Sequence, residues 1–387
     1  MKKIVITLIT LVIAFAMQAQ TNNTFFLGHS LINFDVPNIV NKLSVAGNQF
    51  FSYDANIGNG ANLQWQWNNP TTAQGSIWNT TLPLGGYENF IITEAVPLQN
   101  HLLYSETYRY ADSFYSFANQ YNPNIQYYLY ETWHCTNSGD TSISAGGGYP
   151  CDWDPGSTTP WRARLTQDLS KWESIADSMN LIHTNPMLII PGGQAMARLS
   201  DSIDNNAIPG LASITDLFTD EYHLDNRGNY FIGCVMYSVI HGASPVGLPN
   251  QLTNQYNVLY TNYPTPAQAT QMQEIAWQTV CDYPRSGVNC VNVPLGIKDF
   301  DQTNNTRSSA EQNKKIVAIY PNPAKDQIKI ECSERVLSIT LYDIYGQQII
   351  KQGVDIKALD ISQLLNGMYF VKVQTSYGAE LHNFLKR

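Results

Sequence analysis

Two segments that lie far apart in the sequence together contain the residue types of a nucleophilic hydrolase. Ser30 follows a short apolar run near the start of the chain, and Asp220 and His223 stand three residues apart much later. A serine hydroxyl is a poor nucleophile at neutral pH unless an imidazole takes its proton and a carboxylate orients that imidazole. Because Asp220 and His223 share one turn, a single loop could present both to Ser30. The set therefore predicts acyl transfer through a serine nucleophile.

Ser30 also has a structural interpretation, in which it caps a helix that begins near Asp35. The presence of Asp220 and His223 favours the nucleophile. We expect no catalytic role for His29, which is adjacent to Ser30 but points elsewhere on the turn.

The residues around both segments resemble the SGNH (GDSL-like) hydrolase superfamily. The motifs that carry the resemblance are Gly28-x-Ser30 at the end of an apolar run and Asp220-x-x-His223 followed by Leu224, Gly228 and Tyr230. The resemblance covers roughly residues 21 to 245. It implies a serine hydrolase in which Ser30 attacks the acyl carbon, His223 is the general base and Asp220 orients it. It implies no cofactor, and we expect no metal.

An acyl-transfer site also needs hydrogen-bond donors for the developing oxyanion. The Ser30 N–H is one donor by construction, and the resemblance implies that a glycine N–H supplies another. The segment around Gly58 and Gly60 fits, with Gly60 the better candidate and Gly58 the next. The alternative is an ordinary turn rich in glycine and asparagine.

The chain departs from the family pattern where Gly-x-Asn-Asp is usual. It has Glu94 there, and an ionised glutamate cannot donate to an oxyanion, whereas Gln99 or Asn100 could. Glu94 could instead bind a substrate hydroxyl or hold a neighbouring loop. Trp133 follows another predicted strand and could either stack on a sugar or pack in the core.

Alternating apolar runs predict the scaffold that must position these residues. We expect strands at 25–27, 90–93, 125–131 and 188–190, and helices at 36–46, 104–121, 161–179 and 228–241. This alternation predicts an α/β fold with a parallel sheet and helices on both faces, which is the flavodoxin-like architecture that the SGNH resemblance implies. Ligands in such sheets bind beyond the carboxyl ends of the strands, where Ser30, Glu94 and Trp133 could line one crevice.

Composition and the N-terminus indicate an exported protein. Lys2 and Lys3 precede an apolar stretch that is too short to span a bilayer, so residues 1–19 read as a signal peptide. The formal net charge is −9 and only 14% of residues are charged, which argues against nucleic acid as a partner. Export permits disulfides, and the close spacings predict the pairs Cys135–Cys151 and Cys281–Cys290. We expect Cys234 to be a buried thiol.

The chain divides into a hydrolase domain at 20–295, a polar linker at 296–315 and a module at 316–387. The module alternates apolar and polar residues between Gly, Asn and Asp turns, which predicts a small all-β sandwich. Its motifs, among them Tyr320-Pro321-Asn322-Pro323 and Gly367-Met368-Tyr369-Phe370, resemble the type A C-terminal sorting domain of the type IX secretion system. This resemblance implies the type IX secretion machinery as a partner. It also implies a secreted or surface-attached product of a Gram-negative bacterium of the Bacteroidetes type.

The sequence therefore predicts an exported serine esterase that acts on ester groups, with acetyl groups on polysaccharides as the expected substrate. The alternative is a non-catalytic carbohydrate-binding or surface-adhesion protein on a degraded hydrolase scaffold. The irregular segment around Glu94 is the feature that supports this alternative.

Overall fold

The computed structural model describes residues 22–139, 159–290, 317–332, 335–343, 348–353, 356–375 and 378–387. The predicted signal peptide, Cys151 and the predicted linker lie outside these residues, so the domain limits that depend on them stay predictions. In the part of the chain that is described, no helix combines the length and the apolar character needed to cross a membrane.

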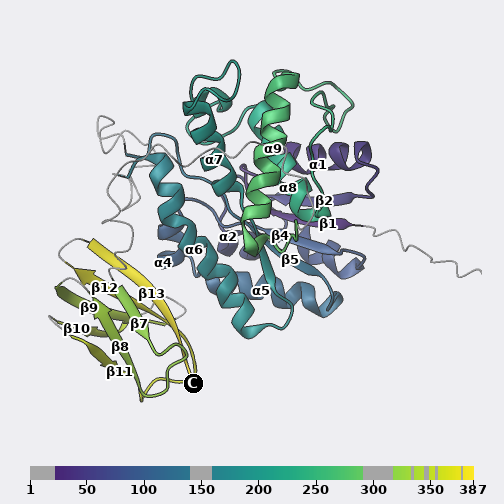
Figure 1. The fold of residues 1–387 in the computed structure, drawn as a ribbon. Helices are drawn as coiled ribbons and strands as arrows, with labels where there is room; N and C mark the ends of the chain where they lie inside the picture. Colours follow the sequence, from purple (N-terminus) through teal and green to yellow (C-terminus); the bar gives the residue numbers. More distant parts are fainter. Residues whose placement is uncertain are drawn as a thin grey trace, which may run out of the picture.

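A six-stranded sheet forms the centre of the larger domain (Figure 1). The spatial order of its strands is β3-β2-β1-β4-β5-β6. Its strands are β1 (Asn23–Gly28), β2 (Ser52–Ile57), β3 (Gln74–Gly75), β4 (Asn89–Ile92), β5 (Gln126–Tyr130) and β6 (Met187–Ile190). All neighbours pair in parallel except β2 and β3. Without the short β3, this is the flavodoxin-like strand order, so the predicted fold class is confirmed.

Helices cover both faces of the sheet because successive strand residues point to opposite sides. Phe26 and Ile91 face one core, with helices α1, α7, α8 and α9, whereas Phe25 and Phe90 face the other, with α5 and α6. The helices are α1 (Asp35–Ala46), α2 (Leu63–Asn68), α3 (Trp78–Thr81), α4 (Leu98–Tyr104), α5 (Thr107–Tyr121), α6 (Trp161–Ile182), α7 (Gly192–Asp204), α8 (Asn226–His241) and α9 (Pro266–Asp282). Short 3-10 turns are η1 (Leu82–Leu84), η3 (Ile214–Leu217) and η4 (Pro284–Ser286).

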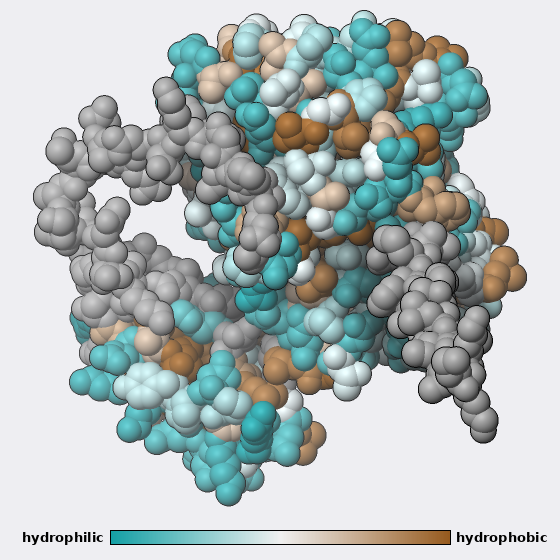
Figure 2. All heavy atoms as spheres, turned by 45° about the vertical axis from the view of Figure 1, so that its right-hand side comes forward, coloured by the Kyte–Doolittle hydropathy of each residue, from teal (hydrophilic) through white to brown (hydrophobic). Residues whose placement is uncertain are grey.

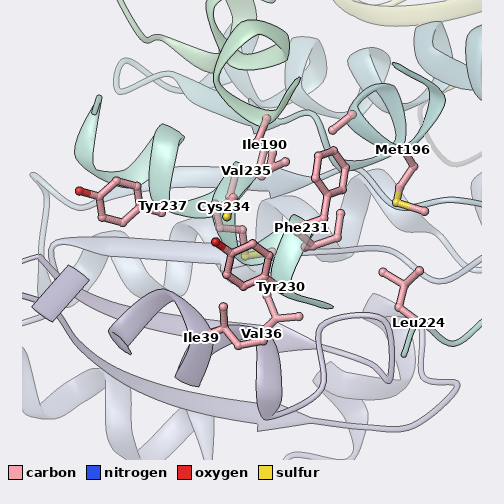
Figure 3. Packing of buried hydrophobic residues seen from close by; sticks show 14 of the residues in the cluster. Val36, Ile39, Ile190, Met196, Leu224, Tyr230, Phe231, Cys234, Val235 and Tyr237 are labelled. Carbon is pink, nitrogen blue, oxygen red and sulfur yellow. The ribbon is translucent and has the colours of Figure 1, made fainter. Parts of the chain in front are cut away.

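Helix α8 is buried on nearly every side, and it anchors the end of the domain that carries His223. Figure 3 shows its Tyr230, Phe231 and Val235 among side chains of α1, of β6 and of α7. Gly228 is required near the start of this helix, since a Cβ there would lie 2.9 Å from Leu224 Cβ and 3.0 Å from the Leu217 carbonyl. The glycine of the family motif is therefore a packing requirement of this chain.

The structure corrects one predicted helix and adds elements that the apolar pattern did not indicate. The helix expected over 104–121 is α5, which begins three residues later, at Thr107, because Glu106 adopts a left-handed conformation with φ 49° and Tyr104 belongs to the end of α4. Strand β2 was not predicted, since its sequence is mostly polar and its first half is only partly buried. Helix α9 was also missed, although Thr265, Pro266 and Gln268 form a capping box with proline at the first turn.

The C-terminal module is the predicted all-β sandwich. One sheet has the order β10-β9-β12-β13 and the other β11-β8-β7. The strands are β7 (Val317–Tyr320), β8 (Gln327–Cys332), β9 (Val336–Tyr342), β10 (Gln348–Gln352), β11 (Ala358–Asp360), β12 (Gly367–Thr375) and β13 (Gly378–Lys386). Their inward residues form a separate core that includes Ile328, Ile339, Leu341, Val371 and Phe384. On the face of the described residues that Figure 2 shows, apolar residues are scattered among hydrophilic ones.

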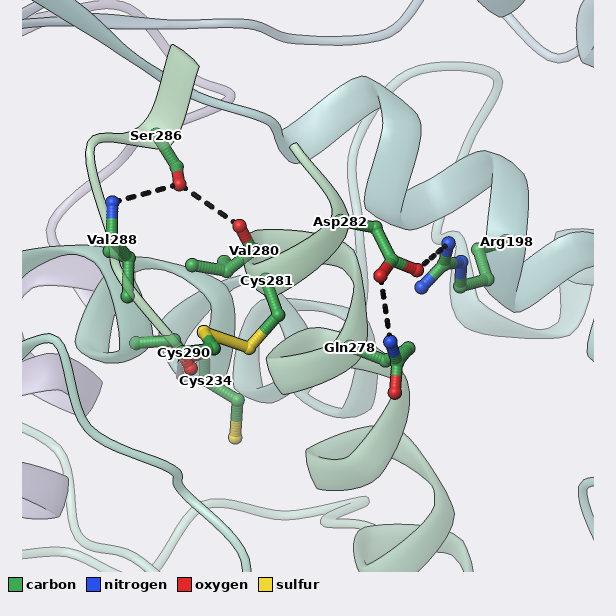
Figure 4. The surroundings of a disulfide bond; sticks show 10 residues. Arg198, Cys234, Gln278, Val280, Cys281, Asp282, Ser286, Val288 and Cys290 are labelled. Atoms are coloured by element: carbon green, nitrogen blue, oxygen red, sulfur yellow. Dashed lines mark hydrogen bonds and ion pairs between the residues drawn. A yellow bond between two sulfur atoms is a disulfide. The ribbon is translucent and has the colours of Figure 1, made fainter. Parts of the chain in front are cut away.

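One of the two predicted disulfides is confirmed. Cys281, at the end of α9, is bonded to Cys290, and Ser286 holds the intervening turn by donating to the Val280 carbonyl at 2.9 Å (Figure 4). Cys234 is a free, buried thiol as expected, and burial raises its pKa to about 12. Cys135 is buried, but Cys151 lies outside the described residues, so that pairing stays a prediction.

Candidate active site

Ser30 lies two residues after the end of β1, at the topological switch point of the sheet. Strand β1 pairs with β2 on one side and β4 on the other, so the loops that leave β1 and β4 diverge above it. The turn is fixed by the Gly28 carbonyl, which accepts from the Gly58 N–H at 2.9 Å and from the Gln66 side chain. The alternative role of Ser30 as a helix cap is taken by Asn33, whose Oδ1 accepts from Asp35 N–H and Val36 N–H.

Asp220 and His223 lie on a tight loop between η3 and α8. Asp220 Oδ1 accepts the backbone N–H groups of Tyr222 and His223, at 2.8 and 2.7 Å. The Thr219 N–H donates to the His223 carbonyl at 2.8 Å, which closes the loop on itself. Asp225 then caps α8 by accepting from two backbone N–H groups, so the rigid helix begins just after the histidine.

The three predicted catalytic side chains form one hydrogen-bonded chain. His223 Nδ1 lies 2.7 Å from Asp220 Oδ2, and His223 Nε2 lies 2.8 Å from Ser30 Oγ. An ionised carboxylate can only accept, so the proton of a neutral imidazole sits on Nδ1. The Nε2 lone pair then faces the Ser30 hydroxyl, which donates to it. This is the arrangement in which histidine can take the serine proton.

Electrostatics keep the orienting carboxylate ionised. Partial burial acts to raise the pKa of Asp220, but hydrogen bonds from His223 and Tyr222 outweigh it and lower that pKa. The side chains of His223 and Asp220 are 44% and 47% exposed, so the pair lies at the surface and is open to a bulky substrate.

His29 is buried beside the site and has no free lone pair. The Leu31 N–H donates to its Nδ1 at 3.3 Å, which leaves the ring proton on Nε2 to donate to the Glu94 carbonyl at 3.1 Å. Burial lowers the pKa of His29 to about 4, so it is neutral at physiological pH. Its role is to tie the turn of Ser30 to the loop after β4.

The two glycines suggested as oxyanion donors differ in whether their backbone N–H is already bonded to another group. The Gly58 N–H is committed to the Gly28 carbonyl, so Gly58 is corrected to a structural role. Gly60 has φ +66° and open space around its Cα, and within the described residues no acceptor engages its N–H. Because Gly60 lies only two residues beyond the amide that is bonded to Gly28, it is the better placed of the pair.

Glu94 does not reach substrate, because its carboxylate is fully buried. Oε1 accepts from the N–H groups of Leu63 and Ala95, at 3.1 and 2.7 Å, and Oε2 accepts from the Thr107 hydroxyl at 2.7 Å. The interpretation of Glu94 as a ligand for a substrate hydroxyl is therefore wrong. The Glu94 carboxylate holds the first turn of α2 and thereby the preceding loop that contains Gly60. Glu94 therefore has the alternative role, which is to hold a neighbouring loop.

We expect Glu94→Gln to remove a pH-dependent loss of stability. Burial raises the pKa of Glu94 from 4.5 to about 7, despite hydrogen bonds that lower it. Between these values the folded state keeps a proton that the unfolded state has lost. The free energy of unfolding should therefore fall as pH rises through this window, by up to about 3 kcal/mol.

Urea unfolding of both proteins at pH 4.5 and pH 8 measures this effect, and the decline should be smaller in Glu94→Gln. Glutamine can accept the same two N–H groups and donate to Thr107, so the fold should be kept. The buried Glu131, whose pKa is raised to about 8, titrates in the same direction in both proteins, so the difference between them is the informative quantity. Parallel declines in the two proteins would contradict the expectation.

Trp133 packs in the core and offers no face to a sugar. It is 1% exposed, and its indole N–H donates to the Tyr222 carbonyl at 2.8 Å. The nearby Thr136 N–H donates to the Glu221 carbonyl at 2.8 Å. The segment after β5 thus holds the loop of Asp220 and His223 in place. Of the two interpretations of Trp133, core packing is the one that the structure shows. The hydrogen bond from its indole to Tyr222 was not indicated by the sequence.

We expect Trp133→Phe to lower kcat by roughly tenfold, because small displacements of a catalytic group are costly. Phenylalanine keeps most of the packing but leaves the Tyr222 carbonyl without its donor. Steady-state kinetics on an ester would check this, with thermal unfolding as the control for folding. Trp172→Phe is a matched control, since Trp172 is equally buried, in the core on the opposite face of the sheet. A kcat that falls equally in both variants would contradict a specific role for Trp133.

Gln99 and Asn100 lie in the first turn of α4 with partly buried side chains. Their suggested role as oxyanion donors stays a prediction. Sequence reasoning missed two residues near them, Asn62 and His101, whose side chains bond to each other at 3.2 Å. The signal that could have found His101 is its position in the segment that replaces the usual family motif.

Taken together, the fold and the site define an α/β protein of flavodoxin-like topology, with a Ser-His-Asp chain at the carboxyl edge of its sheet and a C-terminal β-sandwich. Residues 318–386 match the family described as secretion system C-terminal sorting domain, so the predicted nature of this module is confirmed. Among the curated proteins, no match to this chain is found.

Several solved structures are similar to this chain at low identity. A DUF4886 family protein from Bacteroides uniformis is 15% identical with a TM-score of 0.48, over 68% of this chain and 95% of that one. A carbohydrate esterase family 3 structure from Talaromyces cellulolyticus is 12% identical with a TM-score of 0.33, over 57% and 99%. A GDSL-like lipase from Bacteroides thetaiotaomicron is 11% identical with a TM-score of 0.30, over 57% and 88%.

Proposed function

We propose that this protein is an exported serine esterase. The observation that carries the proposal is the continuous hydrogen-bonded chain from Ser30 Oγ through His223 to Asp220. Ser30 Oγ attacks the acyl carbon while His223 Nε2 takes its proton. The same nitrogen then returns the proton to the leaving alkoxide, and an acyl-enzyme remains. Water, deprotonated by His223, attacks the acyl carbon and releases the acid and free Ser30.

Acetyl groups on polysaccharides are the substrate class that we infer. The sorting domain sends the protein out of the cell through a type IX machinery, to the medium or the cell surface, where polysaccharides are the abundant ester-bearing polymers. The half-exposed His223 and Asp220 support a polymeric substrate, because an acyl group on a long chain can reach them without entering a deep channel. The acidic composition is consistent with a neutral sugar ester rather than a polyanion.

The alternative function is carbohydrate binding or surface adhesion without turnover. The observation that favours it is Glu94, whose carboxylate stands where the family supplies an oxyanion donor and is fully occupied in holding backbone. On this alternative the Ser-His-Asp chain would be intact but without catalytic strength.

Two measurements separate the functions. The purified protein should hydrolyse p-nitrophenyl acetate, and a fluorophosphonate should label Ser30, as read by mass spectrometry of the labelled peptide. Acetate release should then be screened on acetylated xylan and chitin, with acetylated pectin and alginate as the polyanionic comparison and the deacetylated polymers as controls. Polysaccharide binding without acetate release and without labelling would favour the adhesion alternative.

A further inference from the structure

The catalytic loop, residues 220–223, is attached to the rest of the domain through two of its backbone carbonyls. The Tyr222 carbonyl accepts from the Trp133 indole N–H at 2.8 Å, and the Glu221 carbonyl accepts from the Thr136 N–H at 2.8 Å. The Thr136 hydroxyl donates to the same Glu221 carbonyl at 3.3 Å. All three donors belong to one short segment after β5. Because the aspartate and histidine of the loop are half-exposed, their position depends on how firmly this segment is held.

Helix α6 holds that segment, residues 133–136, by two contacts with His134. The Trp161 indole N–H donates to the His134 carbonyl at 2.9 Å, and Asp168 Oδ2 lies 2.7 Å from His134 Nε2. Trp161 and Asp168 are seven residues apart, which is about two helical turns, so both lie on one face of α6. The main chain and the side chain of His134 are thus both fixed to the helix, between the residues that hold the catalytic loop.

Asp168 is the anion at the centre of this attachment. Arg164 Nε lies 3.2 Å from its Oδ2 and Lys171 Nζ lies 2.6 Å from its Oδ1, each about one turn away on α6. Burial acts to raise the pKa of Asp168, but the hydrogen bonds and charges of His134 and Lys171 outweigh it and lower that pKa. Burial lowers the pKa of His134, so its ring is neutral at physiological pH. An ionised carboxylate can only accept, so this ring presents its N–H at Nε2.

The contact between His134 and Asp168 lies deep in the domain. The side chains of both residues are 3% exposed and that of Arg164 is 2% exposed, so water cannot replace a lost partner. Electrostatic contacts are also stronger in such surroundings than at the surface. The contact is therefore a firm attachment, unlike the exposed ion pair of Arg162 with Asp201 on the same helix.

We propose that His134 and Asp168 are positioning residues of the candidate active site, which hold His223 against Ser30 through the 133–136 segment. This inference rests on the proposed esterase function. His223 Nε2 lies 2.8 Å from Ser30 Oγ, and it takes the serine proton only while the loop keeps it within hydrogen-bond reach. A displacement of about 1 Å is enough to slow an enzyme by about 100-fold. The two residues thus act on the rate through the loop.

Three variants test this attachment. His134→Phe keeps a ring in the core but removes the N–H that Asp168 accepts. It should remain folded, because Asp168 keeps its contacts with Arg164 and Lys171. His134→Gln can place an amide N–H close to the position of Nε2, and Asp168→Ala removes the acceptor.

His241→Phe is the matched control for a buried histidine that loses its polar contacts. His241 is partly buried and bonds to Ser44 and Asn22 at the far end of α8. The readouts are kcat and KM for p-nitrophenyl acetate, and amide hydrogen exchange by mass spectrometry of a peptide that contains residues 220–223. Both are measured at a temperature well below the thermal unfolding of each variant.

We expect His134→Phe to lower kcat by roughly 10- to 100-fold and to leave KM within about twofold, because the loop moves and the substrate contacts do not. Amide exchange should become faster in the 220–223 peptide and stay unchanged in peptides of α1 and α5. His134→Gln should recover most of the rate and of the protection. Asp168→Ala should lose as much as His134→Phe, and the double variant should be no slower than the slower single variant, since both changes remove one contact.

The outcomes separate this inference from the function on which it rests. If His134→Phe keeps kcat within about twofold and leaves exchange of the 220–223 peptide unchanged, the two residues do not position the loop, and the esterase stands. A folded His134→Gln protein that is as slow as His134→Phe, or an equal loss in His241→Phe, also contradicts the inference. If the unmodified protein turns over no ester, the esterase function fails, and exchange of the 220–223 peptide in the same variants still decides whether the loop is held. Should Asp168→Ala not fold, the two variants of His134 keep the test.

Discussion

Ser30→Ala is expected to abolish ester hydrolysis, with a loss of kcat of roughly 10⁴- to 10⁶-fold. The change removes the nucleophile that donates to His223 Nε2 at 2.8 Å. His223→Ala should cause a loss of similar size, because the serine proton then has no acceptor. Ser30 is on the turn after β1 and His223 is half-exposed, so neither change opens a cavity in the core. Both variants should unfold at nearly the temperature of the unmodified protein.

The double variant provides the sharper measurement. Residues that act as one unit show non-additive losses, so Ser30→Ala combined with His223→Ala should be no slower than either single variant. Additive losses would indicate that the two residues act independently. Near-normal turnover in both single variants would refute the esterase mechanism altogether. His241→Gln is a control for loss of a histidine, since His241 bonds to Ser44 and Asn22 at the far end of α8.

Removal of the C-terminal module should abolish export and leave catalysis intact. The module has its own core, and none of its residues belongs to the Ser30, His223 and Asp220 set. A chain ending near Val293 keeps Cys290, and with it the disulfide to Cys281. When produced in another host, it should fold and hydrolyse p-nitrophenyl acetate at the rate of the full chain. In its native host it should accumulate in the periplasm, because the sorting domain is missing.

One contact between the two domains bears on this expectation. Phe370 of β12 packs against Tyr108 of α5, with ring centroids 5.0 Å apart. Truncation exposes the Tyr108 ring, and a single ring contact of this kind contributes roughly 1 kcal/mol, so the domain should remain folded. The tests are cell fractionation with immunoblotting for export and steady-state kinetics for catalysis. Truncated protein in the medium would overturn the sorting role, and a folded but inactive domain would mean that the domains share a site.

The pattern of apolar residues in the sequence was sufficient to predict the main architecture of the larger domain. Strands with near-continuous apolar sequence, such as β4 and β6, must be buried on both faces, so their runs were visible without any structure. Strand β2 was not visible because it lies next to the edge of the sheet, and its polar residues bond to neighbours there; Asp54, for example, accepts from Ser76 and Tyr87. The break between α4 and α5 depends on distant partners, since Thr107 bonds to Glu94 and Ser105 to Asn62.

The sequence alone determined the residue types and order of the candidate site: a serine after the first strand, and an aspartate and histidine on one loop before a helix. Local spacing suffices there, because each motif is held by its own turn. Only the tertiary structure decided what Glu94 and Trp133 do, because each is defined by partners that are remote in sequence. Glu94 and Trp133 each follow a strand, as a site residue would, yet both side chains are buried inside the domain.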